Sequence, residues 1–147
     1  MSAEPRAVQV RLLYVSRAKG PQTTTVTTSI LLQAQVHNQV LGITGLLCQG
    51  RGFFFQVLEG GRSEVNALYR RICQDPRHKD VEVLRYEEIG QRRFSQWSMA
   101  FVKIPFDDPM FSRQQPEFDP YAVSGDQVMA LLNHLIDTGQ PITAPTP

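Results

Sequence analysis

Five polar side chains stand where apolar residues are expected, and their chemistry suits hydrogen bonding to a ligand or to one another. Gln56 interrupts the apolar run "FFFQVLEG", and Tyr14 ends the inward row of "VQVRLLYV". Asn38 ends the buried stripe of the helical pattern "SILLQAQVHNQ". Arg71 and Asp75 are spaced i, i+4 beside the apolar stripe of a second helical pattern. Because a buried unpaired amide costs about 1–3 kcal/mol, Gln56 requires a hydrogen-bond partner.

A planar heteroaromatic ligand held between two helices would present donors and acceptors along its edge. The amides of Asn38 and Gln56 carry the donors and acceptors that would match such an edge. Tyr14 would then hydrogen-bond to Gln56 and not to the ligand itself. Each residue type also has an ordinary structural role: a buried tyrosine tied to a carbonyl, a solvated edge glutamine, a helix-ending asparagine and a surface Arg–Asp pair. Residue types alone therefore leave a ligand site and a polar core network both open.

The composition is that of an ordinary globular protein with one domain, since the 147 residues are 41% hydrophobic and 20% charged. A net charge of +1 is too small to indicate the positively charged surface that nucleic-acid binding requires. No apolar run approaches the roughly 20 residues of a membrane span, and the first residues lack a signal-peptide core. Cys48 and Cys73 have neither metal nor disulfide spacing. We therefore expect a cytoplasmic protein with reduced thiols, no metal, and no nucleic-acid or membrane partner.

The order of the apolar patterns predicts the frame that would position the polar side chains. The first helix would be capped by Thr27, Thr28 or Ser29, and Pro76 would end the second. Helices are expected over 29–39 and 64–75, and strands over 8–18, 41–50, 53–60, 81–89 and 97–104. This β-α-β-β-α-β order with a fifth strand is that of a ferredoxin-like α+β sandwich, whose two helices cover one face of the sheet.

The rest of the chain is expected to cover the other face of the sheet. Residues 105–120 are rich in Pro and Phe and predict an irregular connector, while 140–147 predict a frayed tail. Between them, "SGDQVMALLNHLIDTG" predicts a capped amphipathic helix whose inward residues are Val128, Leu131, Leu132 and Leu135. We therefore divide the chain into a sandwich domain, 1–103, and a C-terminal connector and helix, 104–147, that pack on the sheet.

Five segments, in this order and at these separations, resemble the BLUF family, the sensors of blue light using FAD. They are "RLLYVSRA", "HNQVLGITGLL", "FFFQVLEG", "VNALYRRICQDPRHKDVEVL" and "RRFSQWSMAFV". The match runs from about Val8 to Val102, and "GITG", "QVLEG" and "RRF..W.M" are specific as a set. The resemblance implies a short, single-domain member in which residues 1–103 form the flavin-binding photosensory domain.

The resemblance also implies a cofactor site. The family holds FAD non-covalently between its two helices, and the residues of this chain that match its flavin-contacting positions are Asn38, Gln56, Arg71 and Asp75. Some members carry two asparagines where this chain has His37 and Asn38, and only Asn38 matches fully. FAD is therefore the expected cofactor.

The photoswitch that the resemblance implies consists of Tyr14, Gln56, Trp97 and Met99. Gln56 would bridge the Tyr14 hydroxyl and the flavin edge, which explains an amide in an apolar strand. Light would drive proton-coupled electron transfer from Tyr14 to the flavin, and Gln56 would change its hydrogen bonds by rotation or tautomerisation. The output would be a shift in population between two hydrogen-bond arrangements, and the fifth strand, which carries Trp97 and Met99, would respond to it.

We therefore expect a light-sensing signalling protein with no catalytic residues, which acts through a downstream protein partner and forms a homo-oligomer. A flavin-dependent enzyme on the same fold is one alternative, but His37, His78 and His134 are scattered with no evident partner. An acylphosphatase-like activity would need a phosphate cradle, which "SRAKGPQTTT" does not provide. A non-photoactive nucleotide-binding regulatory module is the other alternative.

Overall fold

The computed structural model describes residues 8–106, 118–138 and 142–143. Its elements, in chain order, are β1 (Gln9–Ala18), α1 (Thr24–Leu41), β2 (Thr44–Gln49), β3 (Phe53–Gly61), α2 (Arg62–Cys73), β4 (His78–Glu88), β5 (Ala100–Lys103), α4 (Gly125–Thr138) and β6 (Ile142–Thr143). Within these ranges, no helix is both long enough and apolar enough to cross a membrane. Most of the predicted connector and tail lies outside the described residues.

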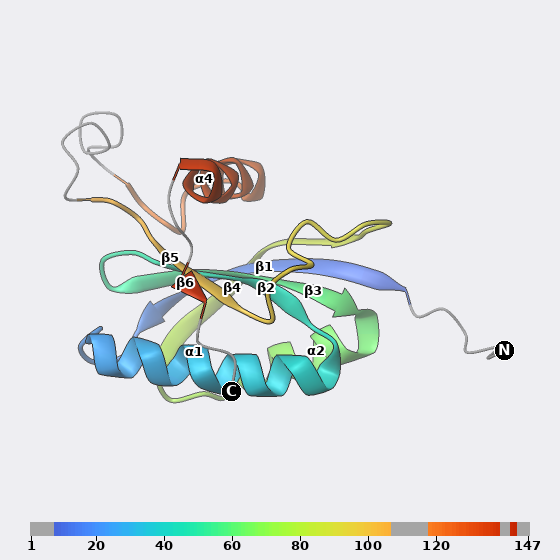
Figure 1. The fold of residues 1–147 in the computed structure, drawn as a ribbon. Coiled ribbons are helices and arrows are strands. Elements are labelled where there is room, and N and C mark those ends of the chain that lie inside the picture. Colours follow the sequence, from blue (N-terminus) through green and yellow to red (C-terminus); the bar gives the residue numbers. More distant parts are fainter. Residues whose placement is uncertain (1–7, 107–117, 139–141, 144–147) are drawn as a thin grey trace, which may run out of the picture.

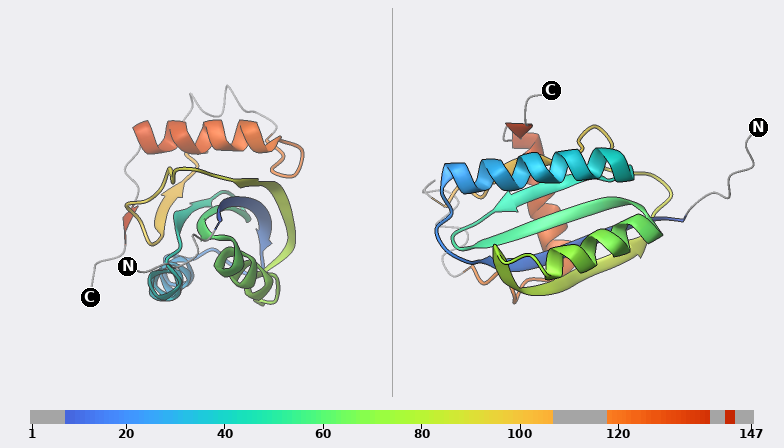
Figure 2. Two further views of the ribbon diagram at one scale, coloured as in Figure 1. Left: turned by 90° about the vertical axis from the view of Figure 1, so that its right-hand side faces the viewer. Right: turned by 90° about the horizontal axis from the view of Figure 1, so that it is seen from below.

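The strands form one sheet in the order β4-β1-β3-β2-β5-β6. Neighbouring strands run antiparallel except β2 and β5, which are parallel. Helices α1 and α2 lie side by side under one face of the sheet, and α4 lies over the other (Figure 1 and Figure 2). The predicted ferredoxin-like α+β fold is confirmed.

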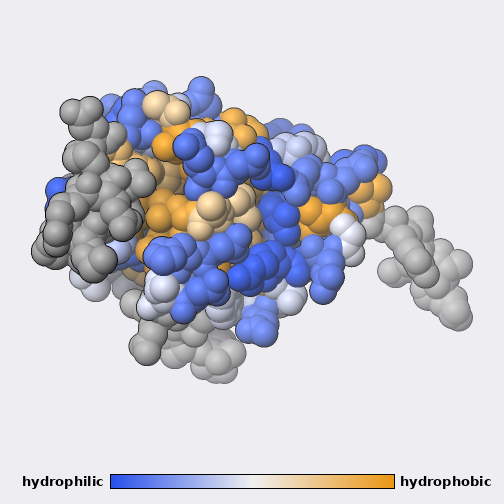
Figure 3. All heavy atoms as spheres, turned by 90° about the horizontal axis from the view of Figure 1, so that it is seen from above, coloured by the Kyte–Doolittle hydropathy of each residue, from blue (hydrophilic) through white to orange (hydrophobic). Residues whose placement is uncertain are grey.

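Each face of the sheet carries its own apolar core. The face toward α1 and α2 buries alternate residues of β1 and β3, among them Leu12 and Leu58. The opposite face buries the intervening residues together with Val128, Leu132 and Leu135 of α4, and Leu131 packs against them half-buried. Seen from the α4 side, apolar side chains gather in the middle of this face with hydrophilic ones around them (Figure 3). A sheet covered on both faces explains why β3 is buried along its whole length.

The helix ends differ from the predicted ones for local reasons. α1 is capped by Thr23, whose side-chain oxygen accepts a hydrogen bond from the Val26 amide, so none of the three predicted caps is used. Its other end is closed by Gly42 in the left-handed region, at φ 67°. α2 ends at Cys73 rather than at residue 75, because the residue before Pro76 is disfavoured in the helical conformation.

The fifth strand is shorter than predicted, so Trp97 and Met99 precede β5 instead of belonging to it. Pairing with β2 begins at Ala100, opposite Leu46. Just before it, the Ser98 carbonyl accepts a hydrogen bond from Asn38 and the Met99 carbonyl accepts one from Gln35. The Trp97 carbonyl still accepts a hydrogen bond from the Gly45 amide of β2 at 3.0 Å, so the segment stays beside β2 although the regular ladder starts only at Ala100.

Candidate functional site

A cavity of about 630 Å³ lies between α1 and α2, against the sheet. Side chains of both helices, of β1, β2 and β3, and of the turn from α2 into β4 line it. Five of the seven predicted site residues are among them: Tyr14, Asn38, Gln56, Arg71 and Asp75. The fold therefore brings together residues that are far apart in the sequence.

Tyr14 and Gln56 form a hydrogen-bonded pair on the floor of the cavity. They are directly opposite in the register of β1 and β3, and the Tyr14 hydroxyl donates to Gln56 Oε1. Burial raises the pKa of Tyr14 far above its usual value of 10, so the phenol stays protonated. Gln56 Nε2 in turn donates to Met99 Sδ at 3.4 Å. Gln56 therefore links a phenol donor to a soft sulfur acceptor inside a dry core.

Asn38 carries an acceptor that the described chain leaves unused. Its Nδ2 donates to the Ser98 carbonyl at 2.7 Å, which fixes the side chain at the end of α1. Its Oδ1 is buried and has no hydrogen-bond partner among the described residues. Because an unpaired buried acceptor is costly, an N–H group on a ligand in this cavity would be stabilised there. The Asn38 side chain therefore suits a heteroaromatic edge.

Asp75 pairs with Arg77 and not with Arg71. Since α2 ends before it, Asp75 lies in the turn toward β4, where its carboxylate accepts from the Arg77 amide at 2.8 Å and from the guanidinium at 2.6 to 3.1 Å. The Arg77 hydrogen bond holds the pKa of Asp75 below its usual value. Arg71 lines the cavity separately. The interpretation of Arg71 and Asp75 as a helical i, i+4 pair was wrong.

Arg77 and His78 are among the cavity residues that sequence reasoning missed. Arg77 has a local signal, because "DPR" is typical of a turn in which the aspartate side chain binds the amide two residues on. His78 has none: its ring nitrogens contact Ser16 Oγ at 2.9 Å and the Ile72 carbonyl at 2.5 Å. Its ring lies 6.2 Å from that of Tyr14, edge-on. His78 thus ties the end of α2 to β1 beside the phenol.

Trp97 and Met99 lie on opposite faces of the sheet. Met99 is buried in the core on the cavity side, where it contacts Gln56. Trp97 packs against the core under α4, and its ring stacks on Phe94 at a centroid distance of 6.4 Å. The structure therefore brings Met99 to Tyr14 and Gln56 and keeps Trp97 away from them.

The family model for sensors of blue light using FAD matches residues 9–100. The chain belongs to the BLUF family. BLUF proteins are flavin-binding blue-light sensors, and this sequence span contains every element around the cavity. A flavin fits the observed chemistry, because the residues lining the cavity include the amides of Asn38 and Gln56 and the phenol of Tyr14, and Asn38 Oδ1 has no partner among the described residues.

Curated BLUF relatives are much longer proteins. The photoactivated adenylate cyclase subunit beta of Euglena gracilis is 35% identical over 101 residues, which are 68% of this chain and 12% of that protein. The blue light- and temperature-regulated antirepressor BluF of Escherichia coli K12 is 33% identical over 93 residues, 63% of this chain and 23% of that protein. The chain thus spans only a small part of the length of these relatives.

Solved BLUF structures match almost the whole chain. BlsA in its ground state has a TM-score of 0.81 at 28% identity, covering 95% of this chain and 94% of that one. BlrB in its dark state has a TM-score of 0.72 at 33% identity, covering 88% and 96%. The coverage includes chain beyond the span of the family match, so the similarity extends past the BLUF sandwich.

Proposed function

We propose that this protein is a blue-light photoreceptor that holds FAD between α1 and α2 and signals through a hydrogen-bond switch at Gln56. One observation carries the proposal. The Tyr14–Gln56 hydrogen bond lies at a cavity that Asn38 also lines, and the buried Oδ1 of Asn38 has no partner among the described residues. A polar core network would have satisfied that oxygen internally, so the arrangement favours a ligand.

The proposed cofactor-binding residues are Asn38, Gln56, Arg71 and Asp75. Asn38 Oδ1 would accept from the ring edge, and Gln56 would present its amide to the same ring. Arg71 stands on the cavity wall, and Asp75 fixes the Arg77 guanidinium on that wall. The family description supports FAD as the flavin.

When bound, the flavin would supply absorption of blue light and an excited state that takes up an electron. Tyr14 is the proposed donor, and light would drive proton-coupled electron transfer from it. Its pKa is raised by burial, so the phenol holds its proton until oxidised, and Gln56 Oε1 is the acceptor already in place. The Gln56 amide would then rotate or tautomerise. Either change alters the donor that now points at Met99 Sδ.

The output is proposed to pass to a downstream protein partner, without catalysis by this chain. The names of the relatives support this, because the same family occurs with a cyclase subunit and an antirepressor. Residues 1–103 would form the photosensory domain, and residues 104–147 a connector and helix on the sheet. Packing of α4 on the core opposite the cavity supports this division. We also propose a homo-oligomer acting in the cytoplasm.

Two measurements test the proposal together. The cofactor of the purified protein is extracted and identified, and the absorption spectrum is recorded in the dark and directly after blue light. The proposal predicts FAD and a flavin band that shifts to the red and recovers in the dark. A bound flavin with an unchanged spectrum would favour a flavin-dependent enzyme. A protein that binds neither FAD nor FMN would contradict the proposal outright.

A further inference from the structure

Glu59 is a buried carboxylate on the face of the sheet opposite the cavity. Its exposed fraction is 0%, although it is charged. Side chains alternate along β3, so Gln56 faces the cavity, whereas Val57 and Glu59 face the α4 side. A charged group in such a place is expensive unless it is paired and hydrogen-bonded. Its partners therefore show what the charge is used for.

Three hydrogen bonds and a further ion-pair contact hold the Glu59 carboxylate. Arg11 Nε and Nη2 each lie 2.7 Å from Oε2. The Arg93 amide donates to Oε2 at 3.0 Å, and the Phe94 amide donates to Oε1 at 2.7 Å. Arg11 is also held by Glu87 at 3.1 Å. Glu59 thus joins β1 and β3 to the backbone of a segment outside the sheet, which an apolar residue of similar size would not do.

That segment, residues 93–99, is held at both ends. Glu59 fixes the first end at Phe94. At the second end, Gln35 and Asn38 of α1 hold the Met99 and Ser98 carbonyls, and Gln56 contacts the Met99 side chain. Between the ends, the Trp97 carbonyl accepts a hydrogen bond from the Gly45 amide at 3.0 Å, the Trp97 amide donates to the Phe94 carbonyl at 3.2 Å, and the Trp97 ring stacks on Phe94. One end of the segment is therefore in contact with the cavity residues, and the other end is fixed by a buried ion pair.

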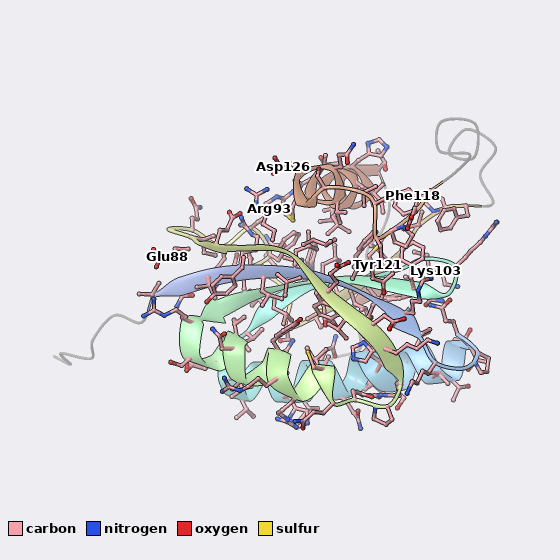
Figure 4. The ribbon with its side chains drawn as sticks, turned by 180° about the vertical axis from the view of Figure 1, so that it is seen from behind. Glu88, Arg93, Lys103, Phe118, Tyr121 and Asp126 are labelled. Carbon is pink, nitrogen blue, oxygen red and sulfur yellow. The ribbon has the colours of Figure 1, made fainter. Side chains whose placement is uncertain are left out.

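We propose that Glu59 is a positioning residue of the photoswitch. By fixing Phe94, it keeps Trp97 on the α4 face and so keeps Met99 Sδ beside Gln56. The inference rests on the proposed function, because it assigns Glu59 a part in the same switch. A rearrangement at Gln56 would free only the Met99 side chain, because Gln35 and Asn38 still hold the backbone at that end. Trp97 would then adjust while Glu59 keeps Phe94 in place. Figure 4 shows Arg93, whose backbone amide donates to Glu59, beside α4 on this face of the sheet.

The test compares Glu59→Gln with the wild-type protein and with Val15→Ala. Val15 is buried on the same face of β1 as Arg11, the partner of Glu59. Its variant therefore reproduces a loss of stability without touching the Glu59 carboxylate. Trp97 is the only tryptophan of the chain, so its emission reports on this segment alone. Dark-state Trp97 emission, its quenching by acrylamide, and the rate of dark recovery of the flavin band are recorded for all three proteins.

Glu59→Gln is expected to retain FAD and the light-induced shift. Its dark-state Trp97 emission should move toward that of the illuminated wild-type protein. Its dark recovery should slow about tenfold, the effect of an interaction energy in the usual range within one hydrogen-bond network. Val15→Ala should leave both quantities unchanged. Arg11→Gln keeps the hydrogen bonds from the Arg93 and Phe94 backbone amides to Glu59, so it should produce a smaller effect in the same direction. It replaces Glu59→Gln in the test if that variant does not fold.

The inference would be overturned if Glu59→Gln had the Trp97 emission and the dark-recovery rate of the wild-type protein. If only Arg11→Gln folds, wild-type values of these two quantities in that variant would overturn it. Glu59 would then be a structural anchor. Failure of the proposed function is distinguishable, because it would appear in the wild-type protein as a missing light-induced shift. The dark-state Trp97 emission would still test whether Glu59 positions the segment in that case.

Discussion

Tyr14 and Gln56 lie directly opposite each other on β1 and β3, and the Tyr14 hydroxyl donates a hydrogen bond to Gln56 Oε1. Both side chains are buried. This pair explains why the apolar strand β3 contains an amide, since an apolar residue would leave the phenol without an acceptor.

Replacing Gln56 by Leu should weaken flavin binding, because one amide contact to the ring is lost. In the variant saturated with FAD the light-induced shift should be abolished, because Tyr14 loses its proton acceptor. Stability should fall by about 1–3 kcal/mol, the cost of a buried hydroxyl left unpaired. Light-minus-dark absorption and denaturant unfolding measure the two effects. Gln49→Leu is the matched control, because Gln49 is also a buried glutamine. It bonds to Thr27, and neither Gln49 nor Thr27 lines the cavity. A normal shift in Gln56→Leu would contradict the switch.

Tyr14→Phe should make the protein less sensitive to alkali. Burial raises the pKa of Tyr14 above 10 in the folded state, so its contribution to stability is present below pH 10 and is lost as the pH rises above that value. Above pH 10, the free energy of unfolding of the wild-type protein should fall faster by about 1.4 kcal/mol per pH unit. Denaturant unfolding of both proteins over this range gives the slopes. Parallel slopes would mean that the phenol is accessible to solvent.

Asn38→Ala should weaken FAD binding about fivefold or more, because it removes the acceptor proposed for the ring edge, a bond usually worth about 1 kcal/mol or more. Titration of the protein without cofactor, followed by flavin fluorescence, gives the dissociation constant. Asn66→Ala is the control, because Asn66 binds the Arg62 carbonyl and Tyr86 and does not line the cavity. Equal affinities for the two variants would remove Asn38 from the binding site.

Leu132→Ala should lower stability by about 2–5 kcal/mol, because it opens a hole in the core between α4 and the sheet. The light-induced shift should remain, since the flavin cavity is on the other face. Leu131→Ala should cost less, because Leu131 is only half-buried. Thermal unfolding and absorption spectra check both. A loss of the shift in Leu132→Ala alone would show that α4 is required for the switch, and not only for packing.

The sequence was sufficient to predict the frame and the central pair. Apolar patterns with periods of two and of 3.6 predicted every element around the cavity, and strand alternation placed Tyr14 and Gln56 on one face. Local signals were weaker at the ends of elements. Pro76 was identified as the end of α2, but the helix stops two residues earlier than the predicted end, and that difference changes the partner of Asp75 from Arg71 to Arg77.

The rest depended on contacts between distant segments. Trp97 and Met99 were expected on a strand, but they precede it, in a segment whose backbone bonds to Gln35 and Asn38 of α1 and to the Gly45 amide. The burial of Glu59 requires Arg11 and two amides beyond residue 92, and nothing in "QVLEG" indicates them. Such partners are determined by tertiary packing, so a single sequence does not predict them.

The most direct test of the switch is the light-minus-dark absorption spectrum of the wild-type protein beside that of Tyr14→Phe, both loaded with FAD. The account predicts a reversible red shift in the wild-type protein and none in the variant, at equal flavin content. A variant that shifts and recovers like the wild-type protein would contradict electron and proton transfer from Tyr14.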